Sequence, residues 1–302
     1  MKASTCAFLT FLLFLSACGP MPPSIPVPEE QRVVPSGKLP RVGLVLGGGA
    51  ARGFAHVGVI RVLEREKIPI DLIVGTSVGS LVGAIYADKK NSFELEWTAF
   101  SLEEKDLFDY TFISPTQGFV RGERLEEFVL KKLSARDFQQ LKVPLAAVAT
   151  DIQNGEMVVL QNGSLARAIR ASSSIPGIFI PVRHQGRLLV DGGVLNNVPV
   201  DVARKMGAEV VIAVNLGAGR KAAQVNNVFD AIVQSLQLMA IESTEARLRE
   251  ADVVIQPAVS HIGAIDFSRK KELLTLGIQA AEQALPRIRE KLLGVAAVRA
   301  GR

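Results

Sequence analysis

Ser77 is the side chain in this sequence that is best placed for covalent chemistry. It stands at the centre of Gly75-Thr76-Ser77-Val78-Gly79, between the apolar run IDLIV and a run of small residues with helical character. Glycines two positions before and after a serine at a strand-to-helix junction are typical of a nucleophile elbow, a sharp turn that exposes the hydroxyl. The alternative is that Ser77 only caps the following helix.

A second glycine-rich turn, GGGAARG, also follows a strand pattern and opens a helix pattern. A dinucleotide loop needs Gly-x-Gly-x-x-Gly, but from Gly48 to Gly53 the middle glycine is missing, and the following strand does not end in an acid for the ribose. The alternative is that amides of Gly47, Gly48 and Gly49 bind the oxyanion of an acyl-transfer intermediate. Arg52 would then add positive charge nearby, unless it forms an ordinary salt bridge.

The motif Asp191-Gly192-Gly193 ends a further apolar strand pattern, GRLLV. A carboxylate at the carboxyl edge of a sheet lies where α/β folds place their sites, and the two glycines let another segment come close. Taken alone, Asp-Gly-Gly is a common turn. Its functional weight comes from the other two glycine-containing motifs.

The chain offers three histidines as possible bases for Ser77, namely His56, His184 and His261. His261 comes last, as the histidine of an α/β-hydrolase triad would, but it lies in a glycine-containing loop with no sign of a fixed position. We expect His56, on the first helix, to be a residue packed in the core or supporting the site, and His184 to lie in a turn. No histidine is therefore assigned to catalysis.

The elements that must position these motifs alternate between strand and helix patterns, which favours helices on both faces of a parallel sheet. Strands are expected at 41–49, 70–74, 143–151, 156–161, 186–191, 209–216 and 251–257. Helices are expected at 50–66, 77–88, 91–104, 123–133, 164–171, 199–206, 226–249, 269–284 and 286–293. Asn154-Gly155 between two strand patterns predicts an antiparallel hairpin. The expected fold is a three-layer α/β/α sandwich with a mostly parallel central sheet.

Residues 107–125 interrupt this alternation with aromatic residues, proline and glycine and without a clear period. Long loops in compact domains often carry function, so this segment could form a flap over a pocket. A packed connecting loop is the other interpretation.

With these motifs in order, the sequence resembles the patatin-like phospholipases, and more closely the bacterial members of that family. The resemblance covers most of residues 41–285 and includes GLVLGGGAARGFAHVGV, IDLIVGTSVGS and LLVDGGVLNNVPV. It implies a patatin-like α/β fold and hydrolysis of lipid acyl esters by a serine–aspartate dyad.

Carried over residue by residue, the resemblance makes Ser77 the nucleophile and Asp191 the base. It places the oxyanion site at the three glycines of the GGGAARG turn, together with Arg52, and it puts the serines of residues 171–176 near the dyad in a structural role. An aspartate needs apolar surroundings to raise its pKa before it can act as a base near neutral pH. We expect no metal or cofactor, because the sequence shows no ligand cluster. A non-catalytic lipid-binding lipoprotein of the same fold is the alternative function.

The first 17 residues predict a secretion signal, with Lys2 before an apolar stretch too short to span a bilayer. The order Leu-Ser-Ala-Cys ending at Cys18 resembles a bacterial lipobox, in which the cysteine becomes the lipid-modified first residue. Ordinary secretion with cleavage near Ala17 is the alternative. Gly19 is not the aspartate that retains lipoproteins at the inner membrane, which favours the periplasmic side of the outer membrane in a two-membrane bacterium.

The remaining sequence divides into a proline-rich tether at 18–40 and one domain at 41–302. Cys6 leaves with the signal and Cys18 is acylated, so no disulfide forms within the chain. The formal net charge of +5 is spread along the sequence, which suits an anionic lipid surface and argues against nucleic acid as a partner. The expected partners are a lipid ester substrate and a membrane surface.

Overall fold

The computed structural model describes residues 39–107, 109, 120–217 and 225–300. These residues belong to one compact unit, which runs from Pro35 to Arg302. The expected signal peptide, Cys18 and nearly all of the tether at 18–40 lie outside the described residues, as does most of the segment 107–125.

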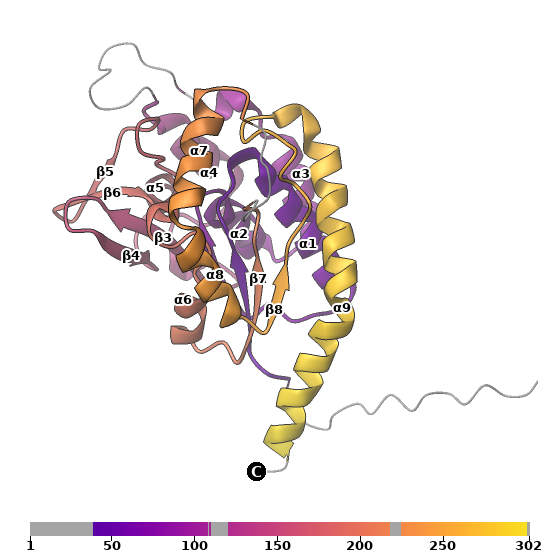
Figure 1. The fold of residues 1–302 in the computed structure, drawn as a ribbon. Coiled ribbons are helices and arrows are strands. Elements are labelled where there is room, and N and C mark those ends of the chain that lie inside the picture. Colours follow the sequence, from indigo (N-terminus) through magenta and orange to yellow (C-terminus); the bar gives the residue numbers. More distant parts are fainter. Residues whose placement is uncertain (1–38, 108, 110–119, 218–224, 301–302) are drawn as a thin grey trace, which may run out of the picture. The chain divides into compact units, whose positions relative to one another are not determined.

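Eight strands form one sheet in the described part of the chain, in the order β5-β6-β3-β2-β1-β7-β8, with β4 also paired to β3 (Figure 1). The bounds are β1 Val42–Leu46, β2 Leu72–Thr76, β3 Leu145–Asp151, β4 Glu156–Leu160, β5 Val182–His184, β6 Arg187–Asp191, β7 Val210–Val214 and β8 Val253–Ile255. The pairs β1–β2, β1–β7, β2–β3 and β7–β8 are parallel, and the pairs of β4, β5 and β6 are antiparallel. The expected mostly parallel sheet is confirmed.

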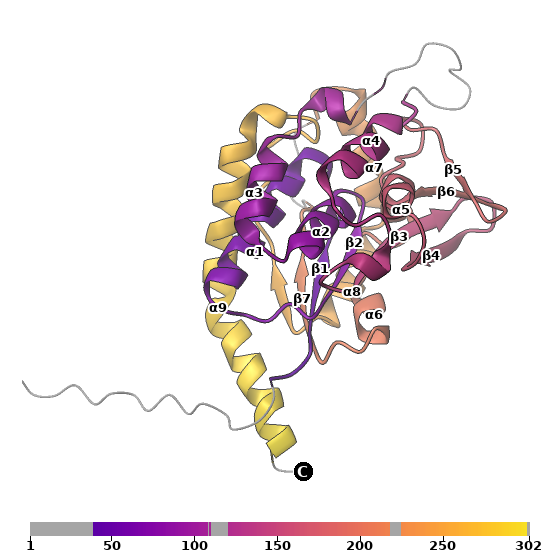
Figure 2. The ribbon, with the colours of Figure 1, turned by 180° about the vertical axis from the view of Figure 1, so that it is seen from behind.

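Nine α-helices flank this sheet within the residues that the structure describes. They are α1 Phe54–Arg65, α2 Val78–Lys89, α3 Ser92–Phe100, α4 Glu123–Lys132, α5 Leu165–Ser172, α6 Val200–Lys205, α7 Val228–Met239, α8 Ile241–Arg249 and α9 Lys270–Ala300. Helices α1, α2, α3 and α9 cover one face, and α6 and α8 cover the other (Figures 1 and 2). The three-layer α/β/α sandwich is therefore confirmed.

The alternation of side chains along β1 shows how the sheet divides the core. Leu44 and Leu46 pack with α1, α2 and α9, whereas Val45 between them packs with α6 on the opposite face. Successive side chains of a strand point to opposite faces, so a continuous apolar run is required where both faces are covered.

Helices α1 and α9 approach each other unusually closely. A Cβ atom on Gly58 of α1 would lie 2.2 Å from the carbonyl oxygen of Leu274, and one on Gly277 of α9 would lie 2.0 Å from that of Ala55. Any side chain at either glycine would collide with backbone, so these two glycines allow α9 to lie directly against α1.

Three differences from the sequence expectations bear on the fold. The helix expected at 226–249 is broken at Ala240 into α7 and α8, and the two helices expected at 269–293 form one helix that contains Pro286. The buried side chains of Ala281, Ile288 and Leu292 on both sides of the proline hold α9 in one line against the domain, despite the lost backbone hydrogen bond. His184 ends β5 rather than lying in the turn.

No helix among the described residues combines the length and the apolar character needed to cross a bilayer.

Candidate active site

Ser77 forms the sharp turn between β2 and α2. Its φ of 54° and ψ of −128° lie in a region that residues with a side chain seldom occupy, and such strain is typical of functional sites. The turn also requires the neighbouring glycines. A Cβ atom on Gly75 would lie 2.4 Å from the amide nitrogen of Ser80, and one on Gly79 would lie 2.1 Å from the carbonyl oxygen of Leu46. This is the geometry of a nucleophile elbow.

Asp191 lies at the end of β6, and the fold brings it to Ser77. Ser77 and Asp191 line the same pocket, and the Ser77 hydroxyl lies close enough to the Asp191 carboxylate to favour its ionised form. The backbone amide of Gly193 donates a hydrogen bond to Asp191 Oδ1, at 2.7 Å. Both side chains are buried, with relative exposures of 7% for Ser77 and 4% for Asp191. The two residues that the sequence singled out therefore contact each other.

The surroundings of Asp191 make its carboxylate a better base than an exposed one. Burial raises the pKa of Asp191 to about 6, although the nearby Ser77 hydroxyl and the hydrogen bond from the Gly193 amide favour the ionised form. A carboxylate with this pKa is ionised at neutral pH and can accept a proton from a nearby hydroxyl.

A pocket of about 380 Å³, a volume that includes its open mouth, lies beside the dyad. We call it the polar pocket because Asp191 and two amide side chains reach it among apolar neighbours. It is lined by Gly48, Gly49, Ala50, Ser77, Ile175, Asp191, Gly193, Asn197, Val233, Leu236 and Gln237. Its floor is the glycine-rich turn after β1, and its opposite wall is α7.

The amides of the glycine-rich turn differ in what they offer to this pocket. The amide of Gly47 donates to the Val214 carbonyl at 3.0 Å, and that of Gly48 donates to the Asn197 carbonyl at 3.3 Å. The amides of Gly49 and Ala50 have no acceptor among the described residues. Of the three glycine amides that the sequence suggested, only that of Gly49 is free, and Ala50 adds a second free amide among the described residues.

Arg52 is not among the residues that line the polar pocket, and the contribution of its charge to an oxyanion site stays a prediction. The side chain is 2% exposed, and its Nε donates to the Ile262 carbonyl at 2.8 Å. Burial lowers the pKa of Arg52, and the nearby Asp230 carboxylate opposes this effect. In this structure Arg52 fastens the glycine-rich turn to the segment that precedes α9.

None of the three histidines, all within the described residues, lines a pocket beside Ser77. The fully buried His56 ring donates from Nε2 to the Gly47 carbonyl at 2.8 Å, and burial lowers its pKa to about 4, so it is neutral near pH 7. His261 is exposed and contacts Glu272 at 3.0 Å. His56 thus supports the turn, as expected.

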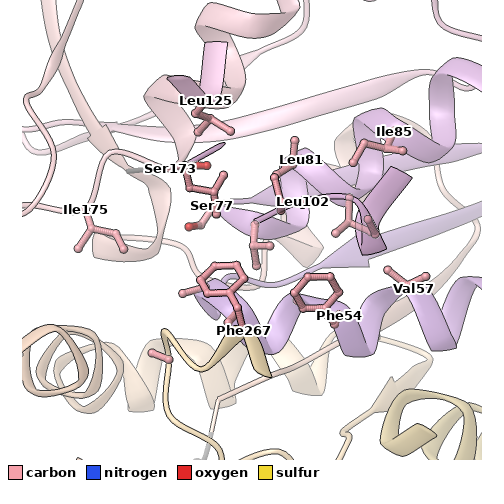
Figure 3. Close-up of a pocket in the computed structure, with 18 of the residues that line it drawn as sticks. Phe54, Val57, Ser77, Leu81, Ile85, Leu102, Leu125, Ser173, Ile175 and Phe267 are labelled. Atoms are coloured by element: carbon pink, nitrogen blue, oxygen red, sulfur yellow. The ribbon is translucent and has the colours of Figure 1, made fainter. Parts of the chain in front are cut away.

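On its other side Ser77 borders an apolar cavity of about 750 Å³, a volume that includes the mouth open to solvent (Figure 3). The walls come from α1, α2, α3, α4, α7 and the segments around residues 175 and 267. Ser77 and Ser173 are the polar side chains among the described residues that line it. Ser77 therefore stands between an apolar and a polar space.

Two polar residues of the site carried no signal that the sequence analysis recognised. Asn197 lines the polar pocket, and its Oδ1 would lie 2.6 Å from a Cβ atom on Gly48. Gln237 reaches the same pocket from α7, and its Oε1 is buried without a hydrogen-bond partner among the described residues. The spacing of Asn197 six residues after Asp191, on the same turn, could have indicated the first, whereas nothing marks Gln237.

Ser172 holds the turn at Ser77 in place through two hydrogen bonds. Its Oγ accepts from the Ser77 amide at 2.9 Å and donates to the Val148 carbonyl at 2.6 Å. The segment 171–176 thus packs against the dyad with Ser172 in a structural role, as expected.

The family model of the patatin-like phospholipases matches residues 44–204. The chain belongs to this family. Lysophospholipase NTE1 of Scheffersomyces stipitis is 30% identical over 274 residues, which cover 80% of this chain and 18% of that protein. Patatin-like phospholipase domain-containing protein 6 of Homo sapiens is 37% identical over 185 residues, which cover 59% of this chain and 13% of that protein. The chain thus spans less than a fifth of the length of these relatives.

The fold is also found in a solved structure, that of VipD from Legionella pneumophila. The two share 15% sequence identity at a TM-score of 0.58, over 83% of this chain and 67% of that one. This likeness concerns the fold alone.

Proposed function

We propose that this patatin-like protein is a serine lipid acyl hydrolase, of phospholipase A or lysophospholipase type, that uses Ser77 and Asp191 as a dyad. The observation that carries the proposal is that Ser77, on a strained turn, lines one pocket with the buried Asp191 carboxylate, whose pKa is raised to about 6. The names of the relatives, which include phospholipases and a lysophospholipase, support the same reaction class.

In the first half of the reaction, Ser77 Oγ attacks the carbonyl carbon of the ester while Asp191 accepts the hydroxyl proton. The carbonyl oxygen becomes negatively charged in the tetrahedral intermediate. The free amides of Gly49 and Ala50 are the donors best placed to stabilise it, with the amino-terminus of α2 adding a favourable dipole. Collapse breaks the bond to the alcohol, which takes the proton from Asp191 and leaves an acyl-enzyme.

In the second half, a water molecule replaces the alcohol. Asp191 accepts a proton from this water as its oxygen attacks the acyl carbonyl, and the same donors stabilise the second intermediate. Collapse returns the proton to Ser77 Oγ and releases the fatty acid. One dyad thus serves both halves, because the departing alcohol restores the carboxylate before water arrives.

The two spaces around Ser77 orient the substrate. An acyl chain gains free energy by leaving water for the apolar cavity, and the glycerol or headgroup side of the ester then faces the polar pocket. Asn197 and Gln237 offer amide groups to hydroxyl and ester oxygens on that side.

A fluorophosphonate ester probe tests the proposal. It should label Ser77, and labelling should disappear in Ser77→Ala and fall strongly in Asp191→Ala. Ser173→Ala, which removes the other hydroxyl of the cavity lining, and His261→Ala should both retain labelling. Loss of labelling in His261→Ala would replace the dyad by a triad. Lipid binding without labelling or fatty-acid release in the folded wild type would indicate a non-catalytic lipid-binding protein.

We also propose that Cys18 carries acyl chains that anchor the protein to the outer membrane of a two-membrane bacterium through the tether at 18–40. The support is the Leu-Ser-Ala-Cys order and the proline-rich sequence after it. The full chain expressed in such a bacterium should incorporate an alkyne-labelled palmitate and fractionate with the outer membrane. Cys18→Ser should abolish both, and incorporation that persists in this variant would contradict the assignment.

A further inference from the structure

The apolar cavity follows helix α2 away from Ser77. Leu81 and Ile85, four and eight residues after Ser77, both line it. At about 1.5 Å of rise per residue, Ile85 lies about 12 Å further along the helix axis than Ser77. Figure 3 shows Leu81 between Ser77 and Ile85, with Ile85 of α2 and Val57 of α1 both at the end remote from the serine.

The remote end of the cavity is formed by well-buried apolar side chains. Val57 is fully buried and Ile85 is 4% exposed, and both belong to the main hydrophobic core. A chain that reached them would meet the densely packed interior of the domain rather than solvent.

From these dimensions, and resting on the proposed function, we propose that the cavity takes a single acyl chain and that Ile85, with Val57, limits its length to about ten carbons. An extended chain with carbon–carbon bonds of about 1.5 Å advances about 1.3 Å per carbon, so about ten carbons fill the distance from Ser77 to Ile85. Ile85 is then a specificity-determining residue for the acyl group.

The dependence of the reaction on chain length follows from burial. Each methylene that enters the cavity is expected to raise kcat/KM about threefold to fourfold, until the chain meets Ile85. Longer chains must bend back or leave their ends outside, so kcat/KM stops rising or falls.

Substitutions at Ile85 should move this limit in opposite directions. Ile85→Ala removes three carbons from the end wall, so the optimum should lengthen by about two to three carbons. Ile85→Phe extends the wall into the cavity and should shorten the optimum by a similar amount. Ile60→Ala provides the matched control, because Ile60 lies on α1 and is equally buried but does not line the cavity.

The test measures kcat/KM for p-nitrophenyl esters from four to sixteen carbons, in mixed micelles of one fixed detergent composition. Fluorophosphonate labelling of Ser77 in each variant verifies that the nucleophile is intact. The expected result is a wild-type optimum near ten carbons that lengthens in Ile85→Ala, shortens in Ile85→Phe and stays unchanged in Ile60→Ala.

Two different failures can be told apart. If wild type is labelled and hydrolyses esters but both Ile85 variants keep the wild-type optimum of chain length, Ile85 does not limit the length of the acyl chain and the inference is overturned. If folded wild type is neither labelled nor active on any ester, the proposed function itself fails and the inference fails with it. Should Ile85→Ala not fold, the Ile85→Phe shift alone decides.

Discussion

The two spaces that meet at Ser77 are built from different parts of the sequence and in different ways. The apolar cavity is lined almost entirely by apolar side chains, whereas the polar pocket adds glycine backbone, Asp191 and two amide side chains to the apolar side chains of Ile175, Val233 and Leu236. The difference indicates a division of labour. Under the proposed function, side chains on one side would provide affinity for an acyl chain, and backbone and carboxylate on the other side would provide the chemistry.

The largest effect on kcat should come from a substitution of Asp191 in the polar pocket. Asp191→Asn keeps the shape of the pocket but removes the base, so kcat should fall about 10²- to 10⁴-fold. The KM for a medium-chain ester should change little, because the apolar cavity is untouched. Steady-state kinetics of the purified variant check this, and a large rise in KM with unchanged kcat would break the proposed division.

A methyl group added to the glycine-rich turn should have the next largest effect. A Cβ atom at position 48 would lie 2.6 Å from Asn197 Oδ1 and 3.2 Å from Ser77 Cβ. Gly48→Ala must therefore displace one of these groups, and a misplacement of about 1 Å at a catalytic site can lower the rate about 100-fold.

Gly294→Ala is the matched control for this substitution. Nothing lies within 4 Å of a Cβ atom there, and alanine in an exposed helix is favoured over glycine by about 1 kcal/mol. Its kcat should equal that of wild type and its melting temperature should rise slightly. A kcat of Gly48→Ala that is also unchanged would show that the turn tolerates displacement.

On the apolar side, Leu81→Ala should act on binding rather than on chemistry. Leu81 lines the cavity one helical turn beyond Ser77 and is 4% exposed. Removing its contacts with an acyl chain should raise KM for a ten-carbon ester about tenfold, since each lost methylene contact weakens apolar burial. The KM for a two-carbon ester, which does not reach Leu81, should stay the same, and an equal rise for both esters would contradict the assignment.

The smallest effect concerns stability and pH. Because the pKa of Asp191 is raised from 3.8 to about 6, its contribution to the free energy of unfolding is fully present below its unfolded pKa and is lost as the pH rises through about 6. Asp191→Asn, which cannot ionise, should therefore melt a few degrees above wild type near pH 8 and lose this advantage near pH 4.

His56 acts in the opposite direction on the wild-type profile. Its pKa is lowered from 6.5 to about 4, so its contribution is present above pH 6.5 and is lost as the pH falls through 4. The difference between the variant and wild type isolates Asp191, since both proteins contain His56. A difference in melting temperature that does not change with pH would show that Asp191 is not perturbed as described.

The sequence was sufficient to predict that Ser77 and Asp191 lie at one site. Ser77 and Asp191 each follow an apolar strand and precede a glycine-containing turn, and strand ends of this kind gather at one edge of an α/β sheet. The fold class followed from the same alternation. The steric need for Gly75 and Gly79 could also be predicted, because the nucleophile elbow has a fixed local geometry.

The details that the sequence did not reveal depend on contacts between distant segments. The Gly47 amide is occupied because it donates to the Val214 carbonyl of β7. The Arg52 side chain is buried because it donates to the Ile262 carbonyl and lies near the Asp230 carboxylate. Similarly, the packing around Pro286 overrides a local preference for a helix end. Local patterns carry no information on such partners.

The close contact of α9 with α1, through Gly58 and Gly277, has a consequence for biogenesis. Phe54 and Val57 of α1 form part of the cavity wall, and their support comes from the helix that is translated after every other described element. A chain in which α9 has not yet been made lacks that support. The cavity wall is therefore expected to take its final form only after α9 has been synthesised and has packed against α1.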